Sequence, residues 1–169
     1  MSECVRILIV DPYEPWRLVV KLFLARCPEW QIVGEASDGV EGLQKTEELR
    51  PDLIILEVAL PKLNGIEAAK SIRSIAPKSK ILFVSVDLCA EIVEAAVKTG
   101  AHGYVVKSDA AVELLPAIKA VVNTTGLLAA DLRTKTSSRI ATSDNGKSRL
   151  QPEEKVTSSK RQCRYIIAI

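Results

Sequence analysis

Residues 7–11 read Ile-Leu-Ile-Val-Asp, a run of four apolar residues that stops on an acid. Three later apolar runs also end at a polar residue, namely Glu57, Ser85 and Lys107. Each run has the length and the Ile, Val and Leu content of a buried β-strand. In an open parallel sheet the carboxyl ends of the strands share one edge, and ligands bind there. The sequence therefore predicts two acids, a hydroxyl and an amine at that edge, a set suited to a phosphate group or a metal ion.

Helical periodicity fills the stretches between these strands. Glu14-Pro15 predicts a helix start, because proline suits the first helical turn. Asp38 and Asn64 are suited to N-terminal helix caps, and Gly100 lies just past the end of a helix. The predicted strands are 5–10, 31–35, 52–56, 80–84 and 103–106, and the predicted helices are 14–26, 38–50, 65–75, 89–99 and 110–123. Alternating units predict an α/β fold with a five-stranded, parallel, doubly wound sheet, and right-handed crossovers favour the flavodoxin-like order 2-1-3-4-5.

The last part of the chain differs from the rest in composition. Residues 1–125 hold 14 Lys and Arg against 17 Asp and Glu, while residues 126–169 hold 9 against 4. Residues 134–160 are rich in Ser, Thr and Lys and have almost no apolar period, which predicts disorder. We therefore expect a single folded domain at 1–125 and a basic, disordered tail at 126–169. The tail is too short for an output domain with its own core, and we expect no direct nucleic-acid binding.

Four motifs together resemble the receiver domain of bacterial response regulators. They are residues 7–11, 51–57, 60–65 and 103–107. The resemblance covers residues 4–124, and it is specific because separate motifs agree in order and spacing. It implies a signal-transduction domain of the two-component, or phosphorelay, type. The segments are most similar to receivers that carry a helix-turn-helix output domain. Because we expect no output domain in the tail, the chain as a whole resembles a stand-alone receiver of the chemotaxis-regulator type.

Two departures from the family pattern fall in the expected pocket. Receivers have two adjacent acids after the first strand, but here Asp11 is followed by Pro12, and the phospho-acceptor aspartate is replaced by Glu57. The resemblance assigns Mg²⁺ ligation to Asp11, Glu57 and the backbone carbonyl of Ala59. We expect this binding to be weak or lost, because Pro12 has no carboxylate and the extra methylene of Glu57 moves the acceptor oxygens by about 1 Å. Compensation by Glu14 is an open alternative, and we expect no other cofactor.

Ser85, Lys107 and Tyr104 match the switch residues of the family. In receivers the hydroxyl and the amine contact the phosphoryl oxygens, and the aromatic ring turns inward when the hydroxyl moves. Glu57 could imitate a phosphoryl group by its charge. We then predict an ion pair with Lys107, a hydrogen bond with Ser85 and an inward Tyr104. Trp16 lies about one helical turn past the acidic pocket, so its fluorescence should report on that pocket.

The leading interpretation is a pseudo-receiver, which acts through protein contacts without normal aspartyl phosphorylation and is not an enzyme. One alternative is a working phosphotransfer receiver that uses Glu57 or Asp11 with a displaced metal. A further alternative is a flavodoxin-like small-molecule binder. The first strand is not followed by a glycine-rich phosphate loop, which disfavours this last class.

We expect protein partners on the face formed by the fourth predicted helix, the fifth strand and the fifth helix. A sensor histidine kinase and a second copy of the chain, giving a dimer, are the candidates. The candidate contact residues are Lys98, Tyr104, Lys107 and Lys119. The sequence has no apolar run of membrane-spanning length, and its four scattered cysteines indicate neither a disulfide framework nor a zinc site. We therefore expect a cytoplasmic location without membrane contact.

Overall fold

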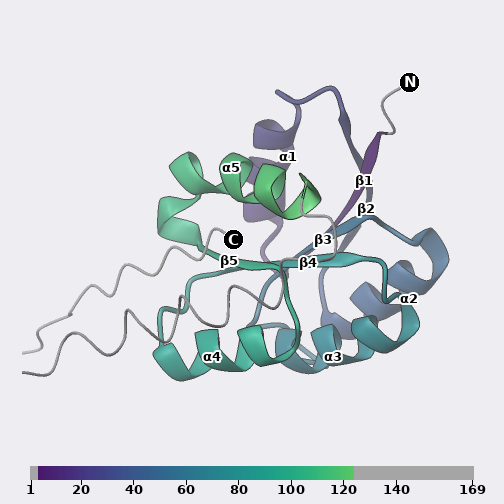
Figure 1. Cartoon of the computed structure of the whole chain (residues 1–169), viewed down its shortest axis with the longest axis vertical. Coiled ribbons are helices and arrows are strands. Elements are labelled where there is room, and N and C mark those ends of the chain that lie inside the picture. The colour runs from purple at the N-terminus through teal and green to yellow at the C-terminus, as the bar shows by residue number, and fades with distance from the viewer. Residues whose placement is uncertain (1–3, 124–169) are drawn as a thin grey trace, which may run out of the picture. The chain divides into compact units, whose positions relative to one another are not determined.

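The computed structural model describes residues 4–123 of the chain. Its strands form one parallel sheet in the order β2-β1-β3-β4-β5, which confirms the predicted α/β fold and strand order (Figure 1). The strands are β1 (Val5–Val10), β2 (Trp30–Ala36), β3 (Leu53–Leu56), β4 (Lys80–Ser85) and β5 (Gly103–Val106). The predicted tail at 126–169 lies outside the described residues.

Two helices, α2 and α3, begin after the capping residues that the sequence indicates. The Asp38 and Asn64 side chains each accept a hydrogen bond from the backbone N–H three residues further on. Gly100 follows the fourth helix with a φ of 81°, a left-handed conformation that glycine adopts without strain. The helices are α1 (Glu14–Leu24), α2 (Gly39–Leu49), α3 (Gly65–Ile75), α4 (Ala90–Lys98) and α5 (Ala110–Asn123), with a 3-10 turn η1 (Lys107–Asp109) before α5. None of the helices in the described part of the chain is long and apolar enough to cross a membrane.

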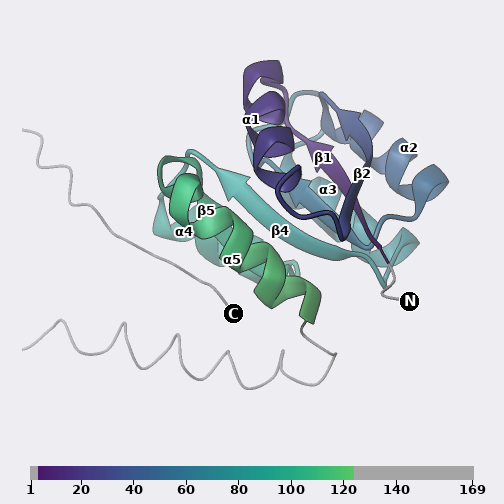
Figure 2. The same ribbon diagram turned by 90° about the horizontal axis from the view of Figure 1, so that it is seen from above.

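Helices cover both faces of the sheet. Figures 1 and 2 show α1 and α5 on one face, with α2, α3 and α4 on the other. Side chains alternate along a strand, so Ile7 and Ile9 pack under α1 and α5, while Leu8 and Val10 belong to the core on the opposite face. All four are 0% exposed. Burial on both faces explains why the strands read as continuous apolar runs.

The sheet register places the predicted pocket residues at one edge. The last residue of β1 pairs with the last residue of β3, so Asp11 and Glu57, which follow them, lie side by side. Ser85 ends β4 and pairs with the last residue of β5, and Lys107 comes directly after that strand. β2 lies on one side of β1, while β3, β4 and β5 follow on the other side, so the strand order reverses between β1 and β3. Open α/β sheets form their binding sites at such switch points.

Candidate functional site

Lys107 joins the two acids at the carboxyl edge of the sheet. Its Nζ lies 2.5 Å from Asp11 Oδ2 and 2.8 Å from Glu57 Oε2. The lysine side chain is 13% exposed, and the two acidic side chains are 3% and 4% exposed. One ammonium group therefore neutralises much of the charge of two adjacent buried carboxylates, which would otherwise repel each other.

Asp11 is held by backbone groups as well as by Lys107. Its N–H donates to the Ala36 carbonyl at 3.0 Å, and its Oδ1 accepts from the Tyr13 N–H at 2.9 Å. Burial raises the pKa of the Asp11 carboxyl, while the hydrogen bond from Lys107 acts in the opposite direction. Each side-chain oxygen of Asp11 thus has a partner.

Glu57 is buried and turns one carboxylate oxygen toward its own loop. Oε1 accepts from the Val58 N–H at 2.6 Å and from the Ala59 N–H at 3.2 Å. A Cβ built on Gly65 would lie 2.1 Å from the Glu57 carbonyl oxygen, so only glycine allows α3 to begin this close to the acceptor position. The start of α3 thus lies directly against the backbone of the acceptor position.

Trp16 is a pocket residue, in contact with Lys107. The lysine Nζ lies 5.1 Å from the centroid of the Trp16 ring, within the range of a cation–π interaction. Sequence reasoning placed Trp16 one turn beyond the pocket as a fluorescence reporter and did not identify the contact. The feature of the sequence that could have predicted this contact is an aromatic residue in the first turn of the helix that follows Asp11.

Tyr104 lies inward, as the sequence interpretation predicted for a phosphoryl-like Glu57. It is 2% exposed, and its hydroxyl donates to the Asp87 carbonyl at 2.9 Å. Burial raises the pKa of Tyr104 to about 12, with a hydrogen bond from Ser85 acting against that rise. The predicted hydrogen bond between Glu57 and Ser85 is absent among the described residues; the Ser85 hydroxyl instead accepts from the Asp87 N–H at 3.3 Å.

Two of the four candidate contact residues are unsuited to a docking surface in this conformation. Tyr104 is packed in the core beside Phe83, and Lys107 is occupied by its two carboxylates. Lys98 and Lys119 are exposed on α4 and α5. Of the four, Lys98 and Lys119 are therefore the residues that remain accessible to a partner.

The residues assigned to Mg²⁺ by resemblance do not fit that ion here. The two available carboxylates are bound to the Lys107 ammonium, and the third position is the exposed Pro12. Glu14, the alternative ligand, is exposed at the start of α1. Within residues 4–123, no group of three or more His, Cys, Asp or Glu side chains could hold a metal ion. Mg²⁺ binds proteins through one or two carboxylates and keeps several waters, but both carboxylates left for it here are already paired with Lys107.

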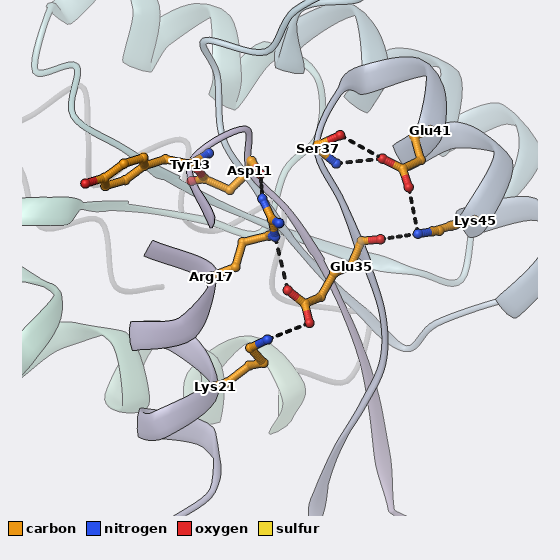
Figure 3. Close-up of polar contacts among 8 residues, drawn as sticks. All are labelled: Asp11, Tyr13, Arg17, Lys21, Glu35, Ser37, Glu41 and Lys45. Atoms are coloured by element: carbon orange, nitrogen blue, oxygen red, sulfur yellow. Dashed lines mark hydrogen bonds and ion pairs between the residues drawn. The ribbon is translucent and has the colours of Figure 1, made fainter. Parts of the chain in front are cut away.

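A polar network outside the predicted site reaches the Asp11 backbone from α1. Figure 3 shows Arg17 between Asp11 and Glu35, with Lys21 on the other side of the Glu35 carboxylate. Lys45 of α2 donates to the Glu35 backbone carbonyl. Hydrogen bonds from Lys21 and Arg17 keep the pKa of Glu35 below its usual range. Sequence reasoning did not find this network, because its members carry no motif.

The family model of the response regulator receiver domain matches residues 7–119. Among curated proteins, the transcriptional regulatory protein DegU of Brevibacillus brevis is 34% identical over 117 residues, which cover 69% of this chain and 50% of that protein. The nitrate/nitrite response regulator NarL of Escherichia coli strain K12 is 36% identical, with 69% and 54% covered. The chain thus spans about half the length of these relatives.

Solved structures show the same similarity. The response regulator domain of Thermotoga maritima CheB is 33% identical, with a TM-score of 0.67 over 72% of this chain and 98% of that one. A two-component response regulator of the LuxR family from Aurantimonas is 29% identical, with a TM-score of 0.69 over 80% and 97%. Both comparisons cover nearly the whole of the solved chain.

Proposed function

The chain belongs to the receiver domain family of two-component response regulators, and on that premise we propose that it is a pseudo-receiver. It signals through protein contacts and is not switched by phosphorylation of an aspartate. The pocket keeps the positions of the acceptor, the switch hydroxyl and the lysine, but Glu57 and Pro12 stand where phosphoryl transfer and metal binding require aspartates.

One observation carries the proposal: both carboxylate oxygens of Glu57 are occupied inside a closed pocket. Oε1 accepts two backbone N–H groups and Oε2 faces Lys107. A phosphoryl group on an acceptor would present anionic oxygens to donors of the same kinds, namely backbone N–H groups and an ammonium. Glu57 therefore supplies by its own charge what the pocket would otherwise obtain from a phosphoryl group. The inward Tyr104 agrees with a permanently switched conformation.

Magnesium plays little part in this function. Lys107 supplies the positive charge between Asp11 and Glu57, and an incoming cation would have to displace it. Pro12 adds no carboxylate, so the ion would have to bind through the same two carboxylates that Lys107 already neutralises.

Partners bind at the face formed by α4, β5 and α5. Its exposed charges include Lys98, which pairs with Glu94 at 2.7 Å, and Lys119 of α5. A sensor histidine kinase and a second copy of the chain are the candidate partners. Because Tyr104 is buried beneath this face, the state of the pocket sets its shape.

Intact-mass measurement after incubation with acetyl phosphate and Mg²⁺ tests the proposal. We expect no phosphoryl adduct on the natural chain. The matched control is the double variant Pro12→Asp with Glu57→Asp, which restores both missing groups and should gain one phosphoryl group. Each single variant should gain less, because metal and acceptor share one pocket and their effects are not additive.

The outcome also separates the alternatives. A phosphoryl adduct on the natural chain that disappears in Glu57→Gln would reject the pseudo-receiver and indicate a working phosphotransfer domain. The addition of beryllofluoride with Mg²⁺ should leave the Trp16 emission of the natural chain unchanged and alter it in the double variant, because Trp16 contacts Lys107.

A further inference from the structure

The Asp11 carbonyl lies where the sheet no longer provides a partner. The N–H of Asp11 still donates to the Ala36 carbonyl, but the β1–β3 pairing ends one residue earlier. Pro12 follows, and a residue before proline is held in an extended conformation. The carbonyl of this buried residue therefore needs a donor from outside the sheet, because an unpaired buried carbonyl destabilises the fold.

Arg17 of α1 is that donor. Its Nη1 donates to the Asp11 carbonyl at 2.7 Å, and its Nε donates to Glu35 Oε2 at 3.0 Å (Figure 3). The Arg17 side chain is only 14% exposed. Glu35 accepts a second bond from Lys21 at 2.8 Å, which holds its carboxylate in place. Because the guanidinium is planar and rigid, these two bonds hold the Asp11 carbonyl and the Glu35 carboxylate in a fixed relation to each other.

We infer that Arg17 is a positioning residue of the pocket: by holding the Asp11 carbonyl from α1, it directs the Asp11 carboxylate toward Lys107. Arg17 acts through Asp11 and makes no hydrogen bond or ion pair to the other pocket acids among the described residues. Its neighbour Trp16 contacts Lys107 from the same helix. Two consecutive residues of α1 thus contact both members of the Asp11–Lys107 pair.

The position of α1 therefore controls the geometry of the pocket. The Asp11 carboxylate accepts from the Tyr13 N–H and from Lys107 on opposite oxygens, so a rotation of the Asp11 backbone would disturb both bonds. The inference rests on the pocket proposed above as the signalling centre, but it can be tested through geometry alone.

Amide hydrogen exchange measured by NMR in Arg17→Gln tests the inference. The Tyr13 amide reports on Asp11, and the Ile55 amide of the central strand β3 reports on global unfolding. We expect the Tyr13 amide to exchange about fivefold faster relative to Ile55, the factor that corresponds to one lost hydrogen bond. The matched control is Lys21→Gln, which removes a bond to the same Glu35 but lies away from Asp11.

The Lys21→Gln variant should leave the ratio of Tyr13 to Ile55 exchange unchanged. An equal change of this ratio in both variants, or equal acceleration at Tyr13 and Ile55 in Arg17→Gln, would overturn the inference and leave Arg17 a purely structural residue. If Arg17→Gln does not fold, Arg17→Lys takes its place, because it keeps the charge beside Glu35 but lacks the planar fork that holds two acceptors in fixed directions. The effect of Arg17→Lys must still exceed that of the control. Phosphorylation of the natural chain would reject the pseudo-receiver without affecting this result.

Discussion

Replacement of Glu57 by glutamine removes the charge that we propose keeps the pocket in its switched conformation. The glutamate uses both oxygens, one toward two backbone N–H groups and the other toward Lys107 at 2.8 Å. A glutamine has one acceptor oxygen, so its amide N–H groups would face either the backbone donors or the ammonium. We expect Glu57→Gln to destabilise the fold.

The burial of the pair sets the size of this loss. An exposed ion pair contributes about 0–1 kcal/mol. Here the two side chains are 4% and 13% exposed, and a hydrogen bond to a charged group contributes about 1.5–3 kcal/mol against about 0.5–1.5 kcal/mol for a neutral one. Lys107 keeps Asp11 as a partner, so no charge is left without a counterion. The expected loss is about 1–2 kcal/mol, or about 0.5–1 M in the urea midpoint if m is about 2 kcal/mol/M.

Urea unfolding at neutral pH, followed by far-ultraviolet circular dichroism at low and high salt, measures this loss. The matched control is Lys98→Met, whose pair with Glu94 is 72% and 66% exposed. Its loss should be at most about 0.5 kcal/mol and should vanish at high salt. The loss in Glu57→Gln should persist at high salt, because buried pairs are screened much less.

A double-mutant cycle with Lys107→Met makes the test decisive. Removal of the lysine leaves Asp11 and Glu57 as adjacent buried anions and should cost about 3–5 kcal/mol. In that background Glu57→Gln should stabilise the protein, because it removes one of two repelling charges. Additive losses in the cycle, or a Glu57→Gln midpoint no lower than that of the Lys98→Met control, would refute the view that Lys107 holds Glu57 in a closed pocket.

Two further predictions concern Gly65, at the pocket, and His102, which lies before β5 at the opposite edge of the sheet. Gly65→Ala should destabilise the fold by about 3 kcal/mol, because the added Cβ would lie 2.1 Å from the Glu57 carbonyl oxygen, and an unchanged urea midpoint would contradict that contact. His102 has its pKa lowered from 6.5 to about 4 by burial, with Arg73 and Lys80 adding to the effect, so below pH 6.5 the unfolded chain binds a proton that the folded one does not. Stability should therefore fall by about 2 kcal/mol between about pH 7 and pH 5, and His102→Asn, which removes this titration, should flatten the profile; equal pH profiles for both proteins would contradict the assignment.

Local signals in the sequence were sufficient for the order of the elements. Apolar runs of strand length, capping side chains at Asp38 and Asn64, and glycine at position 100 act over a few residues, and they predicted the element order that the structure has. The strand order followed from the handedness of the crossovers, which is a rule for whole folds. Boundaries shifted by one or two residues; α1, for example, ends at Leu24 and not at Arg26. Such shifts depend on where each helix meets the sheet, which no local signal records.

The site could be predicted only as a set of neighbours. Strand ends that share an edge bring Asp11, Glu57, Ser85 and Lys107 together whatever their rotamers, and that much followed from the topology. The pairings did not follow from it. Ser85 was expected to bond Glu57, but its hydroxyl accepts from the Asp87 N–H, because the Glu57 carboxylate is already satisfied by its own loop and by Lys107.

The sequence by itself determined which chemical groups meet at the edge of the sheet, because period-two burial and parallel pairing follow from residue order. Tertiary structure alone decided how those groups are used. The Lys107 ammonium bridges two carboxylates, one of which lies 96 positions earlier in the chain, and Arg17 holds the Asp11 carbonyl from a different element. Contacts of this kind depend on rotamers, burial and competition for donors within the folded protein. Residue order does not encode them locally.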